Sequence, residues 1–114
     1  MATEHNDIVN LTDLSAELLD KAATVNSGRA THAFRAVPGG KLTQVLLALK
    51  EGKGLSDHEN PGEALLHVLK GTVHVTVGDD YVEVKENEHA VVPQDRHGVL
   101  AKEDSVALLT VVRY

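Results

Sequence analysis

The pattern of hydrophobic and polar residues divides the chain into one short helical segment and a longer region of strands. Near the N-terminus, Leu14 and Leu18 lie four residues apart, acidic residues come early in the segment, and Lys21 comes late. This order suits an amphipathic helix because charges placed this way complement the helix dipole. The pattern predicts a helix over residues 13–22, with Thr12 as its N-cap.

From residue 30 onward the period becomes that of strands. Val73, Val75 and Val77 alternate with polar residues, and after a Gly-Asp-Asp turn the segment 81–85 alternates again, which predicts a β-hairpin with its valines inward. Short strands separated by turn residues are typical of an all-β sandwich or barrel. No strand is assigned to residues 52–62, which are mostly polar. Further strands are expected at 31–37, 42–49, 65–69, 90–93, 99–101 and 106–112.

Composition and charge narrow the function classes. The 114 residues suit one domain, and with only three aromatic residues the core must be aliphatic. A net charge of −6 leaves no basic surface for nucleic acid, and the absence of cysteine excludes thiolate metal sites. The polar N-terminus and the lack of an apolar run of about 20 residues argue against a signal peptide and a membrane span. We therefore expect a cytoplasmic protein without nucleic-acid or membrane partners.

One spaced framework runs through the middle of the chain. Gly52, His58 and Gly71 are followed by Pro93 and His97. This framework resembles the two sequence motifs of the cupin superfamily, over about residues 30–114. The resemblance implies an all-β, cupin-type (RmlC-like jelly roll) antiparallel β-barrel of six to eight strands. Residues 1–27 would be an N-terminal arm with a short helix, and residues 28–114 the barrel domain.

The cupin motifs also imply a metal site, but two of its usual ligands are replaced in this chain. In the family three His and one Glu converge on an ion; here the second His is Asn60 and the Glu is Ala64. Glu63 is adjacent, but strand alternation places it on the opposite face unless the turn at Pro61 and Gly62 shifts the register. The opening Gly of the second motif is Asn87, a residue that tolerates positive φ. The spacing from Pro93 to the final His is one residue shorter than is usual in the family.

The remaining candidates are His58, Asn60 and His97, which could hold a divalent transition metal ion such as Fe, Mn, Ni or Zn. The two His could equally be hydrogen-bonded polar residues at the barrel mouth. The pocket behind them is predicted to be apolar, lined by Leu66, Val68, Val92 and Val99.

Two functions of different classes follow from this ligand set. The first is a small-molecule-binding cupin, non-catalytic or weakly metal-dependent, with His58, Asn60 and His97 as polar handles. The alternative is a metal-dependent cupin enzyme, of the dioxygenase or isomerase type, that uses His58 and His97. The missing ligands favour the binding protein, because catalytic metal sites usually have three or more protein ligands.

A homodimer is the expected assembly. The segments 42–49 and 106–112 are apolar on both faces, which is more than one side of a small barrel can bury. The outer face therefore needs the helix or a second subunit. Leu65, His67 and Leu69 alternate with the pocket residues and are predicted to lie at this contact.

Overall fold

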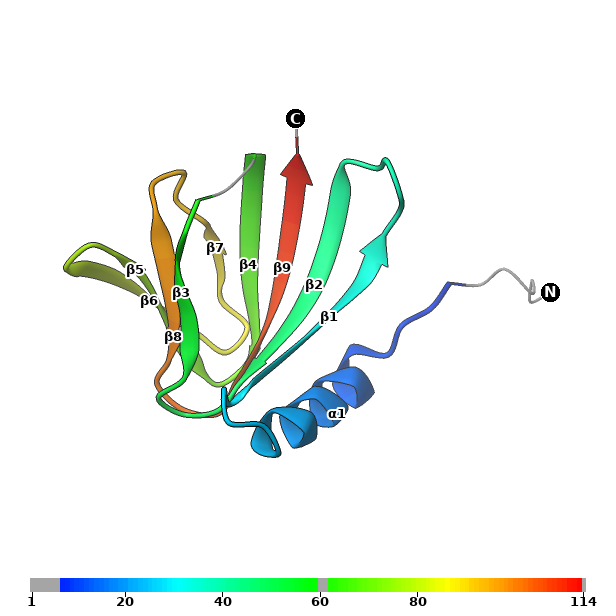
Figure 1. The fold of residues 1–114 in the computed structure, drawn as a ribbon, viewed down its shortest axis with the longest axis horizontal. Helices are drawn as coiled ribbons and strands as arrows, with labels where there is room; N and C mark the ends of the chain where they lie inside the picture. Colours follow the sequence, from blue (N-terminus) through cyan, green and yellow to red (C-terminus); the bar gives the residue numbers. More distant parts are fainter. Residues whose placement is uncertain (1–6, 60–61, 114) are drawn as a thin grey trace.

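The computed structural model describes residues 7–59 and 62–113, and within these it has one helix and nine strands (Figure 1). The strands form two antiparallel sheets, with the orders β1-β2-β9-β4-β7 and β3-β8-β5-β6. The elements are α1 (Leu11–Ala23), β1 (Arg29–Ala36), β2 (Leu42–Leu49), β3 (Gly54–His58), β4 (Gly62–Lys70), β5 (Thr72–Val77), β6 (Asp80–Lys85), β7 (His89–Val91), β8 (His97–Ala101) and β9 (Ser105–Arg113).

The expected all-β jelly roll with one short helix is confirmed, with two differences. The described residues form nine strands rather than the expected six to eight, and the strands pair differently. The strands pair within two separate sheets rather than continuously around a closed barrel. Figure 1 shows the two sheets facing each other, with the β5–β6 hairpin projecting at one side. Val73, Val75 and Val84 are buried as predicted, but Val82 is 59% exposed because β6 is an edge strand at the end of its sheet.

The helix begins earlier than the sequence predicted. It starts at Leu11, and its N-cap is Asn10, whose side-chain Oδ1 accepts a hydrogen bond from the Asp13 backbone N–H at 3.0 Å. Thr12 was therefore the wrong cap, because Asn10 already satisfies the exposed amide at the start of the helix. No helix in the described part of the chain is long and apolar enough to cross a membrane.

The sequence missed strand β3. This strand pairs with β8 on one side only, at Gly54↔Leu100 and again at His58↔His97 after a bulge. Its side chains are largely exposed, so it lacks the alternation that marks a half-buried strand. Gly54 is required by close packing, because a Cβ there would lie 2.0 Å from the Val99 carbonyl oxygen.

Hydrophobic residues pack in two layers on either side of the five-stranded sheet. The main core lies between the two sheets and includes Leu47 and Leu66. On the outer face, Leu18 and Ala22 of α1 cover Leu46 of β2 and its neighbours. The helix thus accounts for part of the apolar surface that the sequence left unassigned. Large hydrophobic residues farther along that face stay exposed, at 38% for Leu65 and 76% for Val91.

Candidate functional site

The structure brings His58 and His97 together. His58 ends β3 and His97 begins β8, and the two residues are register partners in the small sheet. Their ring centroids are 4.4 Å apart, and the ring planes cross at 62°. His97 is 2% exposed, whereas the His58 side chain is open to solvent. The pair therefore has one face in the protein interior and one face in water.

Each imidazole of this pair is held through its Nδ1 atom. The Nδ1 atoms lie 3.0 Å from the Ser56 carbonyl oxygen for His58 and 2.9 Å from the Asp95 carbonyl oxygen for His97. A carbonyl oxygen only accepts hydrogen bonds, so each Nδ1 carries the proton and donates it. Each Nε2 then has its lone pair available for a hydrogen-bond donor or a metal ion. This is also how metal-binding His residues are commonly oriented.

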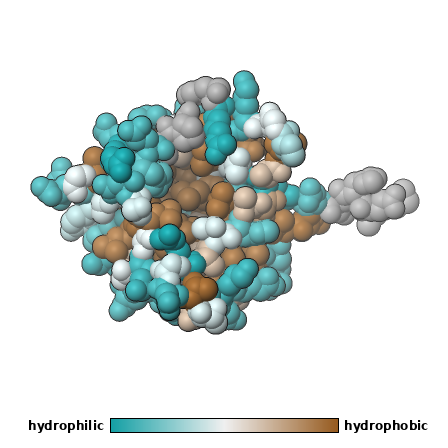
Figure 2. Space-filling view, viewed as in Figure 1, coloured by the Kyte–Doolittle hydropathy of each residue, from teal (hydrophilic) through white to brown (hydrophobic). Residues whose placement is uncertain are grey.

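A small cavity lies beside the two imidazoles, between the sheets. Its volume is about 50 Å³, which is far below the roughly 300–1,000 Å³ typical of sites that enclose a drug-sized ligand. It has room for an ion, for water or for the tip of a larger molecule. Figure 2, seen from the same side as Figure 1, shows hydrophobic surface in the middle of the view, with mostly hydrophilic surface around it. The cavity is lined by Leu55, His58, Ala64, Leu66, Val75, Val92, His97, Val99, Leu109 and Val111.

Three of the four residues predicted to line the pocket do so. Leu66, Val92 and Val99 line the cavity, but Val68 does not: it is fully buried in the core between the sheets. Alternation along β4 places Val68 on the same face as Leu66. Val68 lies two residues farther along the strand, however, and this puts its side chain outside the cavity. Asn60 lies outside the described residues.

The sequence missed several residues of the cavity wall. Leu55 was missed because its strand was not assigned, since β3 has few buried side chains. Leu109 and Val111 alternate along β9 with outward-facing neighbours, so the period of two in the segment 106–112 could have identified them. The Ser56 and Asp95 carbonyls that orient the imidazoles left no sequence signal, because every residue has a carbonyl.

The donor set for a metal ion is incomplete within the described residues. No group of three or more His, Cys, Asp or Glu in residues 7–59 and 62–113 could hold an ion. Ala64 is 4% exposed and lines the cavity, so its methyl group lies where the motif resemblance implied a carboxylate. Glu63 is exposed and lines a groove on the outer side of the sheet instead. Two imidazoles alone support only weak metal binding.

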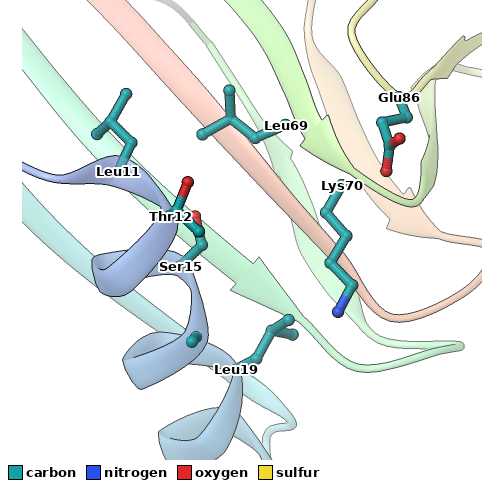
Figure 3. A pocket seen from close by; sticks show the side chains of 8 residues that line it. Leu11, Thr12, Ser15, Leu19, Leu69, Lys70 and Glu86 are labelled. Carbon is teal, nitrogen blue, oxygen red and sulfur yellow. The ribbon is translucent and has the colours of Figure 1, made fainter.

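A larger hollow lies away from the imidazole pair, between α1 and the end of β4 (Figure 3). Its volume is about 460 Å³. Leu11 and Leu19 of the helix approach Leu69 across it, and the charged residues Lys70 and Glu86 lie toward one end. No sequence motif had pointed to this hollow.

His74 makes a cross-strand contact with β6. Its Nε2 lies 3.2 Å from a Glu83 carboxylate oxygen, and its ring stacks on Tyr81 with centroids 4.1 Å apart. Asn87 has a φ of 62°, the positive value expected at that position. His32 lies at a surface hollow beside α1 and does not line the cavity between the sheets.

Comparisons with known proteins agree with this architecture. Similar solved structures include a conserved protein of unknown function from Streptococcus pyogenes (23% identity, TM-score 0.75, covering 98% of this chain and 91% of that one). A cupin-2 domain containing protein from Shewanella frigidimarina has 17% identity and a TM-score of 0.69, with 97% and 100% covered. KdgF from a Halomonas species has 19% identity and a TM-score of 0.62, with 80% and 85% covered.

These similarities to solved structures establish the fold, whereas a family model gives the relationship. No curated protein matches the sequence. Residues 45–113 match the family model described as a cupin domain, which is more than half of the chain and includes both His58 and His97. The chain therefore belongs to the cupin family.

Proposed function

We propose that this protein is a small-molecule-binding cupin, non-catalytic or weakly metal-dependent, that holds its ligand with His58 and His97. The carrying observation is the pair of imidazoles, each fixed by a backbone carbonyl, beside an apolar cavity. Fixed polar groups in an otherwise apolar cavity are the usual composition of a small-molecule site. Asn60 is proposed as a third polar handle from its place in the sequence.

The chemistry of the cavity selects the kind of ligand. Because both Nε2 atoms offer lone pairs, they complement a hydroxyl or amino group, or a metal ion. Aliphatic walls complement a short apolar group next to that donor. The 50 Å³ volume admits only the tip of the ligand, so the rest of the molecule would remain at the open end beside His58.

A metal-dependent enzyme of the dioxygenase or isomerase type is the second candidate. The observation in its favour is the hydrogen bond from each Nδ1 to a carbonyl, which is the usual support of a metal-binding His. A bound Fe, Mn, Ni or Zn ion would supply Lewis-acid or redox chemistry. In that case His58 and His97 would hold the ion, and the aliphatic walls would exclude water from it.

Metal analysis and a ligand screen distinguish these proposals. Protein purified without an affinity tag is analysed for bound metal and then screened against small alcohols and amines by thermal unfolding. Under the binding proposal, a ligand found in the screen raises the melting temperature of wild type but not of His58→Ala, and added Ni²⁺ reduces this rise because it competes for Nε2. Under the enzyme proposal, Ni²⁺ or a retained metal makes the rise in melting temperature larger.

The matched control is His74→Ala, which removes an imidazole from a different part of the molecule. We expect this variant to keep the response of wild type, because His74 contacts Tyr81 and Glu83 rather than the cavity. Hits that bind wild type, His58→Ala and a His97→Asn variant equally well would show that the imidazole pair is not the binding site.

A further inference from the structure

A second pair of imidazoles lies on the outer face of the five-stranded sheet. His67 of β4 and His89 of β7 are register partners on neighbouring antiparallel strands. Their ring centroids are 5.7 Å apart, with the planes crossing at 67°. Leu66 is buried between the sheets, so alternation along β4 places His67 on the opposite face, away from the cavity. His89 is exposed and His67 is half-buried.

The orientation of His67 is fixed by Asn87. The Asn87 Oδ1 lies 3.0 Å from His67 Nε2, so this ring nitrogen donates its proton to the amide oxygen. The Nδ1 of His67 then has its lone pair available. Asn87 is itself held by the chain, since its backbone N–H donates to the Val68 carbonyl at 2.6 Å and its φ is 62°. The contact thus comes from a fixed turn rather than from a free side chain.

We propose that His67 and His89 form a bidentate site for a divalent transition metal ion, with Asn87 as the residue that positions His67. Metal–nitrogen bonds are about 2 Å and the ring radius about 1 Å, so two rings on one ion have centroids no more than about 6 Å apart. The observed 5.7 Å lies within this limit. Water would complete the coordination, and affinity should follow the order Zn²⁺ < Ni²⁺ < Cu²⁺ that holds for nitrogen ligands.

The charge around this pair also favours a cation. Glu86 and Glu88 flank Asn87 in the turn between β6 and β7, and the whole chain carries a net charge of −6. Long-range attraction of this kind raises the local concentration of cations rather than selecting one. Selection comes from the two imidazoles, which prefer Ni²⁺, Cu²⁺ and Zn²⁺ to the abundant Mg²⁺ and Ca²⁺.

This site is separate from the cavity between the sheets. His58 and His97 belong to the four-stranded sheet, whereas His67 and His89 belong to the other sheet and face outward. A test can therefore remove one pair and leave the other intact. Failure of the outer site would leave the proposed function untouched, and failure of the cavity site would leave the outer site untouched.

The test is calorimetric titration of the tag-free protein with Ni²⁺ in a buffer that does not bind metal. We expect His67→Ala and His89→Ala each to weaken one class of Ni²⁺ sites at least tenfold. Asn87→Ala should weaken the same sites by a smaller factor, because it leaves both ligands in place. His58→Ala should leave this class unchanged, and His32→Ala is the control for loss of an exposed imidazole elsewhere on this sheet.

Three results would overturn the outer site: no Ni²⁺ binding by wild type, binding unchanged in both outer variants, or loss caused by His58→Ala alone. Circular dichroism of each variant excludes unfolding as the cause of a loss. His89 is exposed and His67 is only partly buried on the outer face, so the fold should persist. Electron paramagnetic resonance of the Cu²⁺ complex gives a second measure when every protein also carries His58→Ala, which removes the inner pair: two nitrogen ligands with the outer pair intact, and one in either outer variant.

Discussion

The substitution Ala64→Glu tests the role of the cavity most directly. Ala64 lies in the cavity wall with His58 and His97, and it is 4% exposed. A glutamate there would place a carboxylate beside the two Nε2 lone pairs and supply the third protein ligand that the described residues lack. We therefore expect Ala64→Glu to convert a weak two-imidazole site into a three-ligand site.

The magnitudes follow from the size and polarity of the cavity. Without metal, a longer side chain in a 50 Å³ space should destabilise the protein by about 1–3 kcal/mol, and more if the carboxylate remains charged. Metal should reverse this loss. At a free metal concentration of 100 times Kd, binding to the folded state adds about 2.7 kcal/mol, or roughly 10 °C in Tm for a domain of this size.

Thermal unfolding with and without Ni²⁺ measures both effects. All variants carry His67→Ala so that an ion on the outer face does not contribute. The control is Ala64→Gln, which has nearly the same size but is a much weaker metal ligand, so it should show the loss of stability without the rescue. Adding His58→Ala to Ala64→Glu should abolish the rescue. Equal Ni²⁺ stabilisation of the Glu and Gln variants would refute the assignment of Ala64 to a position facing the imidazoles.

Three further outcomes are expected. Gly71→Ala should destabilise more than Gly78→Ala in urea unfolding, because both glycines have positive φ (83° and 58°) but only at position 71 would a Cβ meet atoms, at 2.3 Å. The hydrogen bond from Lys50 lowers the pKa of Asp104, so Asp104→Asn should reduce stability near pH 7. That difference should shrink below about pH 4, as the carboxylate of the folded state is protonated. We propose a homodimer through the outer sheet face, a contact that would compete with an ion on His67, so Leu65→Lys in metal-free buffer should lower the mass seen by light scattering; a concentration-independent 12.2 kDa for wild type would refute it.

Sequence pattern predicted the strands that have at least one buried face, and it failed for β3, whose side chains are largely exposed. The hairpin of β5 and β6 was found because Val73 and Val75 alternate with polar residues on a half-buried sheet. Strand β3 was not found from the sequence, because an edge strand with exposed side chains can be polar throughout. Strand β2 has the predicted bounds, whereas the bounds of the other strands moved by up to three residues, since strand ends are set by pairing with distant segments rather than by local sequence.

The sequence pointed to the two imidazoles that the structure brings together, but not to the shape of the cavity beside them. The motif spacing pointed to His58 and His97, and their contact depends on the β3–β8 register, which neither segment contains by itself. The size of the cavity was not predictable, because it depends on how side chains from five strands and the segment after β7 fill the space between two sheets. The direction of each lone pair was equally hidden, since it is set by the backbone carbonyls of Ser56 and Asp95.

The framework that this chain shares with cupins is conformational, and that explains how it can persist without the full ligand set. Gly52 and Gly71 have φ values of 80° and 83°, which few residues other than glycine adopt, so the fold itself requires them. Ala64 has no such role: it only presents a side chain to the cavity, and an aliphatic wall accepts a methyl group without cost to packing. A sequence can therefore lose ligands and keep the fold. The function must then be argued from the two fixed imidazoles and the 50 Å³ cavity beside them, as they occur in this chain.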